Sequence, residues 1–380
     1  MTAVGFVGLL LGLLAWQVAF VNRTRTRVGV FLLAFVFHAA AAFVYHEWVQ
    51  TNTADTILYY FDPYSFYGEG IGLGTQFVVY LVQFLKETIG GTYLDYFLLF
   101  QAAGFWGIAF LMRTLEEVYL ELGVEQPRLS YLILFLPGIH FWTSAIGKDA
   151  WLFLGCSLAV WSAMRLGRRF IPFGIAIVIM ILFRAHIALL ALTALAVAVL
   201  FERRVGTFAK IALLVSALAG AVFVLGTVES TFNVDIRSAE SVGDFLQKQS
   251  EVTSQIEGGT AVVGASYPVR LLSLLFRPFF FDAGGAFGLI SSFENAFILF
   301  MAVTIFRYFS EARALARRVF FLRFAAVFGV VLALLLALVY YNVGLGLRQK
   351  MMFMPSLLVF FAALIGVRQA RLRPVALSYA

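Results

Sequence analysis

The sequence predicts an all-α integral membrane protein with about eleven transmembrane helices, and three observations support this prediction. Of the 380 residues, 62% are apolar and 13% are charged, whereas a soluble domain carries about 25% charged residues. The mean hydropathy is +0.91. Basic residues fall in short clusters between apolar runs. This pattern encodes membrane topology, so we do not interpret the net charge of +7 as a sign of nucleic-acid binding.

The apolar runs define the predicted spans, each of which needs roughly 20 apolar residues. The first run has no basic n-region and no clear cleavage site, so we interpret it as a span rather than a signal peptide. The runs between 130 and 183 are shorter than the others. The candidate spans are 3–21, 29–46, 94–112, 130–146, 150–164, 170–183, 187–201, 208–227, 286–306, 320–341 and 352–367.

Loop charges predict the orientation of these spans. With the N-terminus outside and the C-terminus inside, 19 of the 28 basic residues and six of the 21 acidic residues lie in inside segments. The positive-inside rule selects this arrangement over its reverse.

Two long segments then lie outside the membrane. The first, 47–93, is aromatic and acidic, and it includes TQFVVYLVQFLKETIG, which predicts an amphipathic or re-entrant helix. The second, 228–285, is acidic at first, with a plausible short helix over 238–256, and ends in the predicted interfacial helix YPVRLLSLLFRPFFFDAGG. Tyrosine and tryptophan favour the interface, so we expect the first segment to lie on the membrane surface.

Six basic residues stand at span ends or in interfacial segments on the outside, where the positive-inside bias acts against them. A shared anionic ligand, such as a lipid phosphate or diphosphate, would account for them, because arginine grips phosphate oxygens bidentately and lysine supplies a point charge. Snorkelling to lipid headgroups, or pairing with nearby acids, is the simpler alternative. These six residues are Lys148, Arg184, Arg270, Arg277, Arg348 and Lys350.

Carboxylates accompany these cations. Asp55 and Asp62 flank an aromatic run, and Asp149 directly follows Lys148. Sugar transfer from a lipid phosphate needs a base for the acceptor hydroxyl and cations for the leaving phosphate. Asp55 and Asp149 are candidate bases, although loop acids can be simply solvated and Asp149 can pair locally with Lys148. Glu294 falls near the start of a span, where an acid is a functional candidate by default.

The remaining polar residues in spans have a simpler interpretation. His38, Gln101 and His140 are typical of hydrogen bonding between helices, although His140 also precedes the Lys148 segment. The four histidines lack metal-ligand spacing, and one cysteine allows neither an intramolecular disulfide nor a cysteine metal cluster.

Three stretches carry a resemblance to a known group of proteins. They are FLPGIHFWTSAIGKDA (135–150), LFRPFFFDAGGAFGLISSFENA (275–296) and YYNVGLGLRQKMMFMPSLL (340–358). They resemble elements of polytopic proteins that are found with bacterial cell-envelope polysaccharide genes and are described as glycosyltransferase-like or repeat-unit polymerase-like.

The resemblance implies a GT-C-like transferase of the bacterial inner membrane. It would use sugars or glycans linked to polyprenyl phosphate at the extracytoplasmic face, with membrane lipid and polysaccharide assembly proteins as partners. A divalent cation, Mg²⁺ or Mn²⁺, is a possible cofactor. GT-C enzymes commonly carry an acidic pair after the first span, whereas the acidic loop here follows the second, so the role of Asp55 stays open. The residues marked by the resemblance are Lys148, Asp149, Arg277, Pro278, Glu294, Asn342, Arg348 and Lys350.

A carrier or flippase of lipid-linked oligosaccharide is the alternative function, and it would use the same cations without chemistry. A carrier needs a polar path that reaches both faces of the membrane. The polar residues of this chain gather toward one face, which favours the enzyme. A structural scaffold, a third class, would not need nine basic residues outside.

Overall fold

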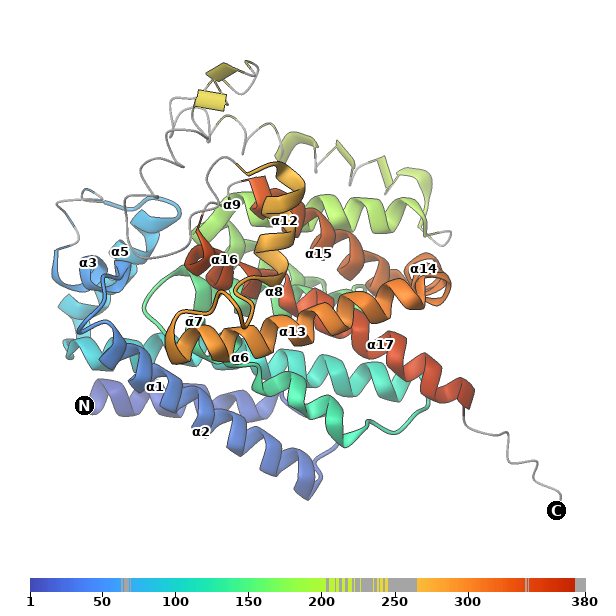
Figure 1. The fold of residues 1–380 in the computed structure, drawn as a ribbon. Helices are drawn as coiled ribbons and strands as arrows, with labels where there is room; N and C mark the ends of the chain where they lie inside the picture. The colour runs from blue at the N-terminus through green and yellow to red at the C-terminus, as the bar shows by residue number, and fades with distance from the viewer. Residues whose placement is uncertain are drawn as a thin grey trace.

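The computed structural model describes residues 1–202, 265–338 and 342–372, apart from 63, 65–67 and 69, together with residue 340 and scattered positions between 205 and 244. Long helices run side by side through the molecule (Figure 1). The short helices α3, α5, α7 and α16 gather at one end, and α14 lies at the other (Figure 1). The elements in order are α1 (Ala3–Leu13), η1 (Leu14–Gln17), α2 (Arg25–Trp48), α3 (Asp55–Phe61), α5 (Thr75–Ile89), α6 (Tyr93–Glu121), η2 (Arg128–Phe135), α7 (Pro137–Trp142), α8 (Lys148–Ala163), α9 (Phe170–Leu200), α12 (Tyr267–Phe276), α13 (Gly285–Arg307), α14 (Phe309–Arg318), α15 (Phe320–Leu338), α16 (Val343–Gln349), η3 (Lys350–Met352) and α17 (Met354–Leu372).

Six of the described helices are long and apolar enough to cross a membrane, namely α2, α6, α9, α13, α15 and α17. Their outward faces carry large apolar side chains, such as Val36, Phe300 and Phe306, which are 62%, 56% and 81% exposed. Apolar exposure of this extent in so many helices is compatible with lipid as the solvent and not with water. The chain is therefore a multi-pass helical membrane protein.

Helix α6 forms the centre of the bundle and packs against α1, α2, α8 and α17. Its apolar stretch is 83% buried, more than that of any other long helix. Glycines let its neighbours approach closely, as is typical of membrane helices. A Cβ atom on Gly8 of α1 would lie 2.4 Å from the carbonyl oxygen of Leu98, and one on Gly104 would lie 2.1 Å from that of Thr143.

Helix α9 folds back on itself at Arg184, whose backbone is extended (φ −157°, ψ 88°). The ring of Phe173 lies 5.8 Å from that of Phe324, and the ring of Phe201 lies 5.8 Å from the guanidinium carbon of Arg323. In a straight helix, residues 173 and 201 would be about 42 Å apart, too far for both to reach neighbouring residues of α15. The two arms of α9 therefore match the predicted spans 170–183 and 187–201.

The predicted span 130–146 is wrong as a continuous helix. The segment forms the 3-10 helix η2, the six-residue helix α7 and a non-helical stretch after Trp142. Pro137 explains the break, because its ring excludes helical backbone at the preceding Leu136, which is extended (ψ 118°).

Other predicted segments have mixed outcomes. The helix predicted over TQFVVYLVQFLKETIG is confirmed as α5. The helix predicted over 267–285 is confirmed only as far as Phe276, as α12, and the residues from Arg277 to Gly284 are not helical. The first predicted span is short, with α1 followed by η1. The predicted span 208–227 lies partly, and the predicted helix 238–256 largely, outside the described residues.

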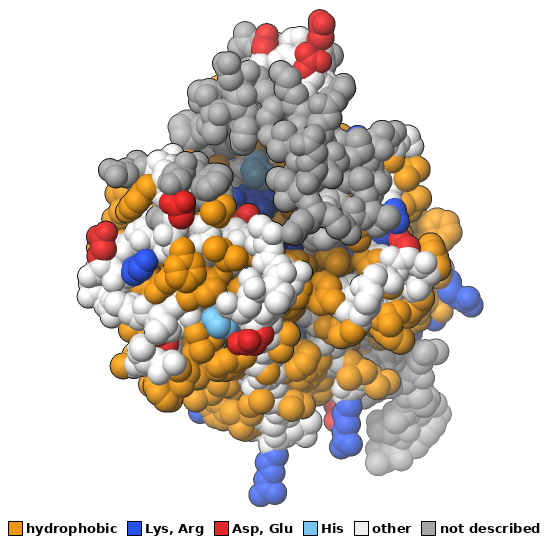
Figure 2. All heavy atoms as spheres, turned by 60° about the vertical axis from the view of Figure 1, so that its left-hand side comes forward, with side chains coloured by type: hydrophobic (Ala, Val, Ile, Leu, Met, Phe, Trp, Pro, Cys, Tyr) orange, Lys and Arg blue, Asp and Glu red, His pale blue; other side chains and the backbone are white. Residues whose placement is uncertain are grey.

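Charged side chains collect at the two ends of the bundle. At one end, carboxylates of α6 and α14 pair with arginines from the segments predicted to lie inside. The pairs are Arg27 with Glu116, Arg113 and Arg169 with Glu117, Arg165 with Glu121, and Arg368 and Arg371 with Glu311. Figure 2 shows basic side chains projecting below a broad apolar surface. The other end carries the site described next.

Candidate functional site

Arg348 on α16 joins three segments that are distant in the sequence. Its Nη1 atom donates a hydrogen bond to Oδ2 of Asp55 at 3.0 Å, and its Nε atom donates to Oδ2 of Asp149. Asp55 is the first residue of α3, and Asp149 is the second residue of α8. Asn342 caps α16 by accepting the Gly344 N–H at 2.7 Å, so it positions the helix that carries Arg348.

Lys148 extends this cluster toward α5 and α9. Its Nζ atom donates to the Thr75 hydroxyl at 2.7 Å, and the N–H of Gly74 donates to the Leu182 carbonyl at 2.8 Å. These bonds place the N-termini of α5 and α8 beside the break in α9 at Arg184. Arg184 acts electrostatically on both Lys148 and Asp55, so it belongs to the same group.

The charges in this cluster perturb one another strongly. Burial lowers the pKa of Lys148 to about 7, with further lowering from Arg184 and Arg348. Burial alone would raise the pKa of Asp55, but Arg348, with smaller effects of Lys148 and Arg184, holds that pKa below its ordinary value. Burial would lower the pKa of the Arg348 guanidinium, but the carboxylates of Asp149 and Asp55 more than offset burial and raise that pKa.

The cluster is open to a ligand on one side. The side chain of Asp55 is 47% exposed, whereas that of Asp149 is 6% exposed. Oδ1 of Asp149 is buried and has no hydrogen-bond partner among the described residues. In the view of Figure 2, basic, histidine and acidic side chains are visible together above the apolar surface. The arrangement can bind an anion and offers one accessible carboxylate beside it.

A second, fully buried cluster lies behind the first and is built around Lys350. Its Nζ atom donates to Oδ1 of Asn295 at 2.5 Å and to the Leu275 carbonyl at 3.5 Å. Glu294 accepts the N–H of Gly138 at 2.6 Å and interacts electrostatically with Lys350. Burial lowers the pKa of Lys350. This cluster ties α13 to α7, α12 and η3, and thereby supports the turn that follows Arg348.

Arg277 occupies the loop between α12 and α13. Its Nε atom donates to Oδ2 of Asp282 at 2.5 Å, and the N–H of Phe279 donates to the other oxygen of that carboxylate. The carbonyl of Pro278 accepts a hydrogen bond from Asn295 at 2.8 Å, so this loop is joined to the Lys350 cluster. Arg277 is 29% exposed and also acts electrostatically on Tyr340.

The structure does not bring every predicted site residue together. Arg270 donates to the backbone carbonyls of Ala265 and Leu338 and stands apart from both clusters. His140 is fully buried, bonds the Leu134 carbonyl at 2.7 Å and packs edge-on against His38. Asp62 ends α3 as its C-cap residue, seven residues from Asp55.

Four residues that the sequence analysis missed take part in these clusters: Thr75, His186, Asp282 and Asn295. His186 lies within electrostatic reach of Arg184 and Lys148. Local signals existed for three of them, because His186 and Asp282 follow predicted arginines closely and Asn295 follows Glu294. Thr75 had no such signal, because its contact spans 73 residues.

Within the described part of the chain, no group of three or more His, Cys, Asp or Glu side chains is placed to hold a metal ion. Comparison of the chain with family models, with curated proteins and with solved structures gave no match. The fold and the site thus define a multi-pass helical membrane protein with a mixed cluster of cations and carboxylates at one end of its bundle.

Proposed function

We propose that this protein is a membrane-embedded glycosyltransferase or polysaccharide polymerase. It would act on sugars linked to polyprenyl phosphate or diphosphate at the extracytoplasmic face of the bacterial inner membrane. The observation that carries the proposal is the gathering of Lys148, Arg184 and Arg348 with two carboxylates at one end of the bundle.

The cations suit a lipid-linked phosphate. Arg348 and Arg184 supply planar guanidinium groups that match phosphate oxygens, and Lys148 adds a third positive charge. The N-termini of α5 and α8 point their partial positive charge toward the same region. When Lys148 is protonated, three cations against two carboxylates give a formal charge of +1. An anionic phosphate would offset this charge.

The carboxylates suit the acceptor. Both Asp55 and Asp149 are bound by Arg348. A phosphate that competes for Arg348 would release a carboxylate oxygen, which could then accept the proton of an acceptor hydroxyl. The acceptor oxygen would bond to the anomeric carbon as the bond from that carbon to the phosphate oxygen breaks. The polyprenyl phosphate or diphosphate would leave, held by the three cations.

Asp55 and Asp149 differ in exposure, and for this reason we assign them different roles. Asp55 is half-exposed and can reach an acceptor that enters from the aqueous side. Asp149 is buried, and its second oxygen, Oδ1, has no hydrogen-bond partner among the described residues. We therefore assign the base to Asp55 and the orientation of Arg348 to Asp149. Glu294 lies in the buried Lys350 cluster, where it acts as a positioning residue.

The test is a transfer assay with the purified protein in nanodiscs. Synthetic polyprenyl-phosphate and polyprenyl-diphosphate sugars are supplied, and glycan products are identified by mass spectrometry. We expect Arg348→Ala and Asp55→Asn to abolish transfer while thermal unfolding shows a folded protein. Glu87→Gln is the matched control, because Glu87 is an exposed carboxylate outside the cluster. Tight binding of the donor lipid by wild-type protein without turnover would contradict the transferase and favour the carrier.

A further inference from the structure

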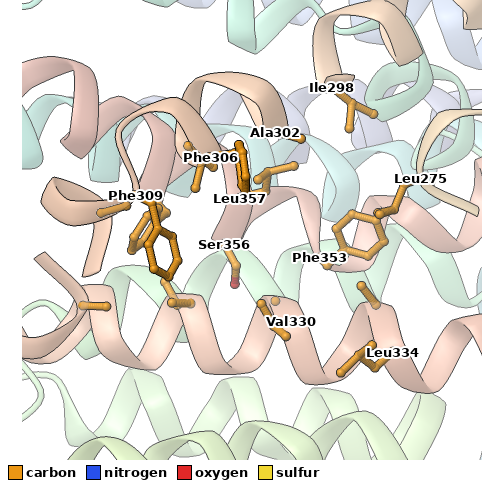
Figure 3. A pocket seen from close by; sticks show the side chains of 18 of the residues that line it. Leu275, Ile298, Ala302, Phe306, Phe309, Val330, Leu334, Phe353, Ser356 and Leu357 are labelled. Carbon is orange, nitrogen blue, oxygen red and sulfur yellow. The ribbon is translucent and has the colours of Figure 1, made fainter. Parts of the chain in front are cut away.

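A large apolar cavity lies between α12, α13, α14, α15 and α17; it shares Leu275 with the Lys350 cluster, and no residue of the Arg348 cluster lines it. Its volume is about 620 Å³, which falls in the range of roughly 300–1,000 Å³ that is typical of sites for small organic ligands. Figure 3 shows side chains from these helices converging on it, with Ile298 and Ala302 on one side and Val330 and Leu334 on the other. Ser356 supplies a polar atom, a hydroxyl oxygen with no hydrogen-bond partner among the described residues.

The cavity is a groove that opens toward the surrounding membrane. Rim side chains from three helices are widely exposed, with Phe306, Phe309 and Val330 at 81%, 60% and 59%. Along α15 the lining runs from residue 325 to residue 334, a rise of about 14 Å. This is close to half of the roughly 30 Å hydrocarbon core. The groove is therefore about one leaflet deep, and it is open to lipid along its side.

One end of the groove is charged. Helix α14 covers this end with Phe309, Ala312 and Ala316, while Arg313 also lines the groove. Arg317 follows Arg313 by one turn, on the same side of the helix. Neither arginine has a side-chain ion pair among the described residues, because Glu311 of the same helix is bound by Arg368 and Arg371. The groove thus ends at two free positive charges.

We propose that this groove binds an acyl chain of an anionic membrane phospholipid, with the headgroup phosphate at Arg313 and Arg317. The apolar walls would exclude water from the chain, and the two arginines would favour an anionic headgroup over a zwitterionic one. The groove fits a lipid better than a partner helix, because its length is that of one leaflet and its charge stands at one end. The inference is independent of the proposed transferase, whose phosphate site lies at the opposite end of the bundle.

The first experiment measures lipid binding by native mass spectrometry of the full chain in detergent. Dioleoyl phosphatidylglycerol and dioleoyl phosphatidylcholine differ only in the headgroup. Because each arginine contributes about fivefold, we expect the anionic lipid to bind about 25-fold more tightly than the zwitterionic one. The double variant Arg313→Gln, Arg317→Gln lacks two positive charges, each of which strengthens binding of the anionic lipid about fivefold, and it should lose that preference. Arg25→Gln is the matched control, an exposed arginine on α2 that does not line the groove, and it should keep the preference.

A second experiment places the lipid. Phosphatidylglycerol with a photoreactive group in its acyl chain should cross-link to peptides of α13 and α15, and Ala302→Phe should reduce this labelling at least fivefold by filling the groove. Thermal unfolding verifies that the variant is folded. Equal affinity for the two lipids, a preference that survives the double arginine change, or labelling confined to other helices would each overturn the proposal. Displacement of the phosphatidylglycerol by a lower concentration of polyprenyl phosphate would also overturn it, because the groove would then belong to the donor lipid.

Discussion

Arg348 shows how one side chain can define a site at the end of a helical bundle. Its partners Asp55 and Asp149 lie 293 and 199 residues away in the sequence. Arg348 is a main cause of the lowered pKa of Asp55, so it holds this carboxylate ionised. Any anion that competes for the guanidinium would therefore change the proton affinity of Asp55.

Lys148 gives the cluster a measurable pH dependence. Its folded pKa of about 7 lies below the ordinary value of 10.5, so between these values the unfolded chain carries a proton that the folded chain lacks. Stability must then rise with pH across this window, and below pH 7 the full penalty of burying the charge is present. We expect Lys148→Met to raise the melting temperature more at pH 6.5 than at pH 9.5, by on the order of 2–4 °C.

Thermal unfolding in detergent at the two pH values is the measurement. Lys86→Met is the control, because Lys86 is bonded to the Tyr60 carbonyl outside the cluster. An equal gain for Lys148→Met at both pH values would show that Lys148 keeps an ordinary proton affinity in the folded protein.

The Lys350 cluster allows a double-mutant cycle. Lys350→Met leaves Glu294 as a buried charge without its cation, which typically costs about 3–5 kcal/mol of stability. Glu294→Gln still presents an oxygen to the Gly138 N–H, so adding it to Lys350→Met should recover most of that loss. Chemical unfolding of wild type, both single variants and the double variant measures the coupling. Strictly additive effects would mean that the two charges do not interact.

At the scale of elements, sequence patterns predicted the long helices and several short ones. Helices α2, α6, α13, α15 and α17 follow apolar runs, and α5 and α12 follow shorter amphipathic ones. The span 130–146 failed because apolar content alone does not reveal that Pro137 interrupts the helical hydrogen bonds. Hydropathy is high both for helices that face lipid and for segments buried in protein. An irregular segment buried against other helices therefore has the same hydropathy as a span.

Part of the candidate site could also be predicted from local features of the sequence. The charge bias of the loops singled out Lys148, Arg184 and Arg348, and these residues do share one cluster. Arg270 met the same criterion, yet its guanidinium bonds to backbone carbonyls elsewhere. Which cations meet depends on how helices pack, and a single sequence carries no direct record of those contacts.

The hairpin in α9 is testable at this scale. We expect spin labels at Ile171 and Leu200, both exposed to the outside of the bundle, to lie less than about 30 Å apart. A straight helix would place these positions about 43 Å apart. Double electron–electron resonance on the Ile171→Cys, Leu200→Cys protein measures the distance, in a Cys156→Ser background that removes the native cysteine. A distance near the straight-helix value would contradict the reversal at Arg184.

For the whole molecule, the separation of charges is the feature that relates fold to function. Helix α6 carries Asp95 in its first turn and Glu116 and Glu117 near its end, and about 33 Å separates residues 95 and 117 along the helix. This distance matches the hydrocarbon core of a bilayer. The arginine pairs of Glu116 and Glu117 then mark one membrane surface, and the Arg348 cluster marks the other.

The sequence-based orientation predicts which surface is which. Thr26 lies in the first turn of helix α2 and Thr51 lies three residues beyond its end, and both are exposed. The helix from Thr26 to Trp48 rises about 33 Å. In a Cys156→Ser background, we expect Thr51→Cys to react with a membrane-impermeant maleimide added to intact cells. Thr26→Cys should react only after the membrane is opened, because the arginines beside it favour the cytoplasm. The reverse labelling would place the Arg348 cluster in the cytoplasm, where a lipid-linked donor for extracytoplasmic transfer would not meet it.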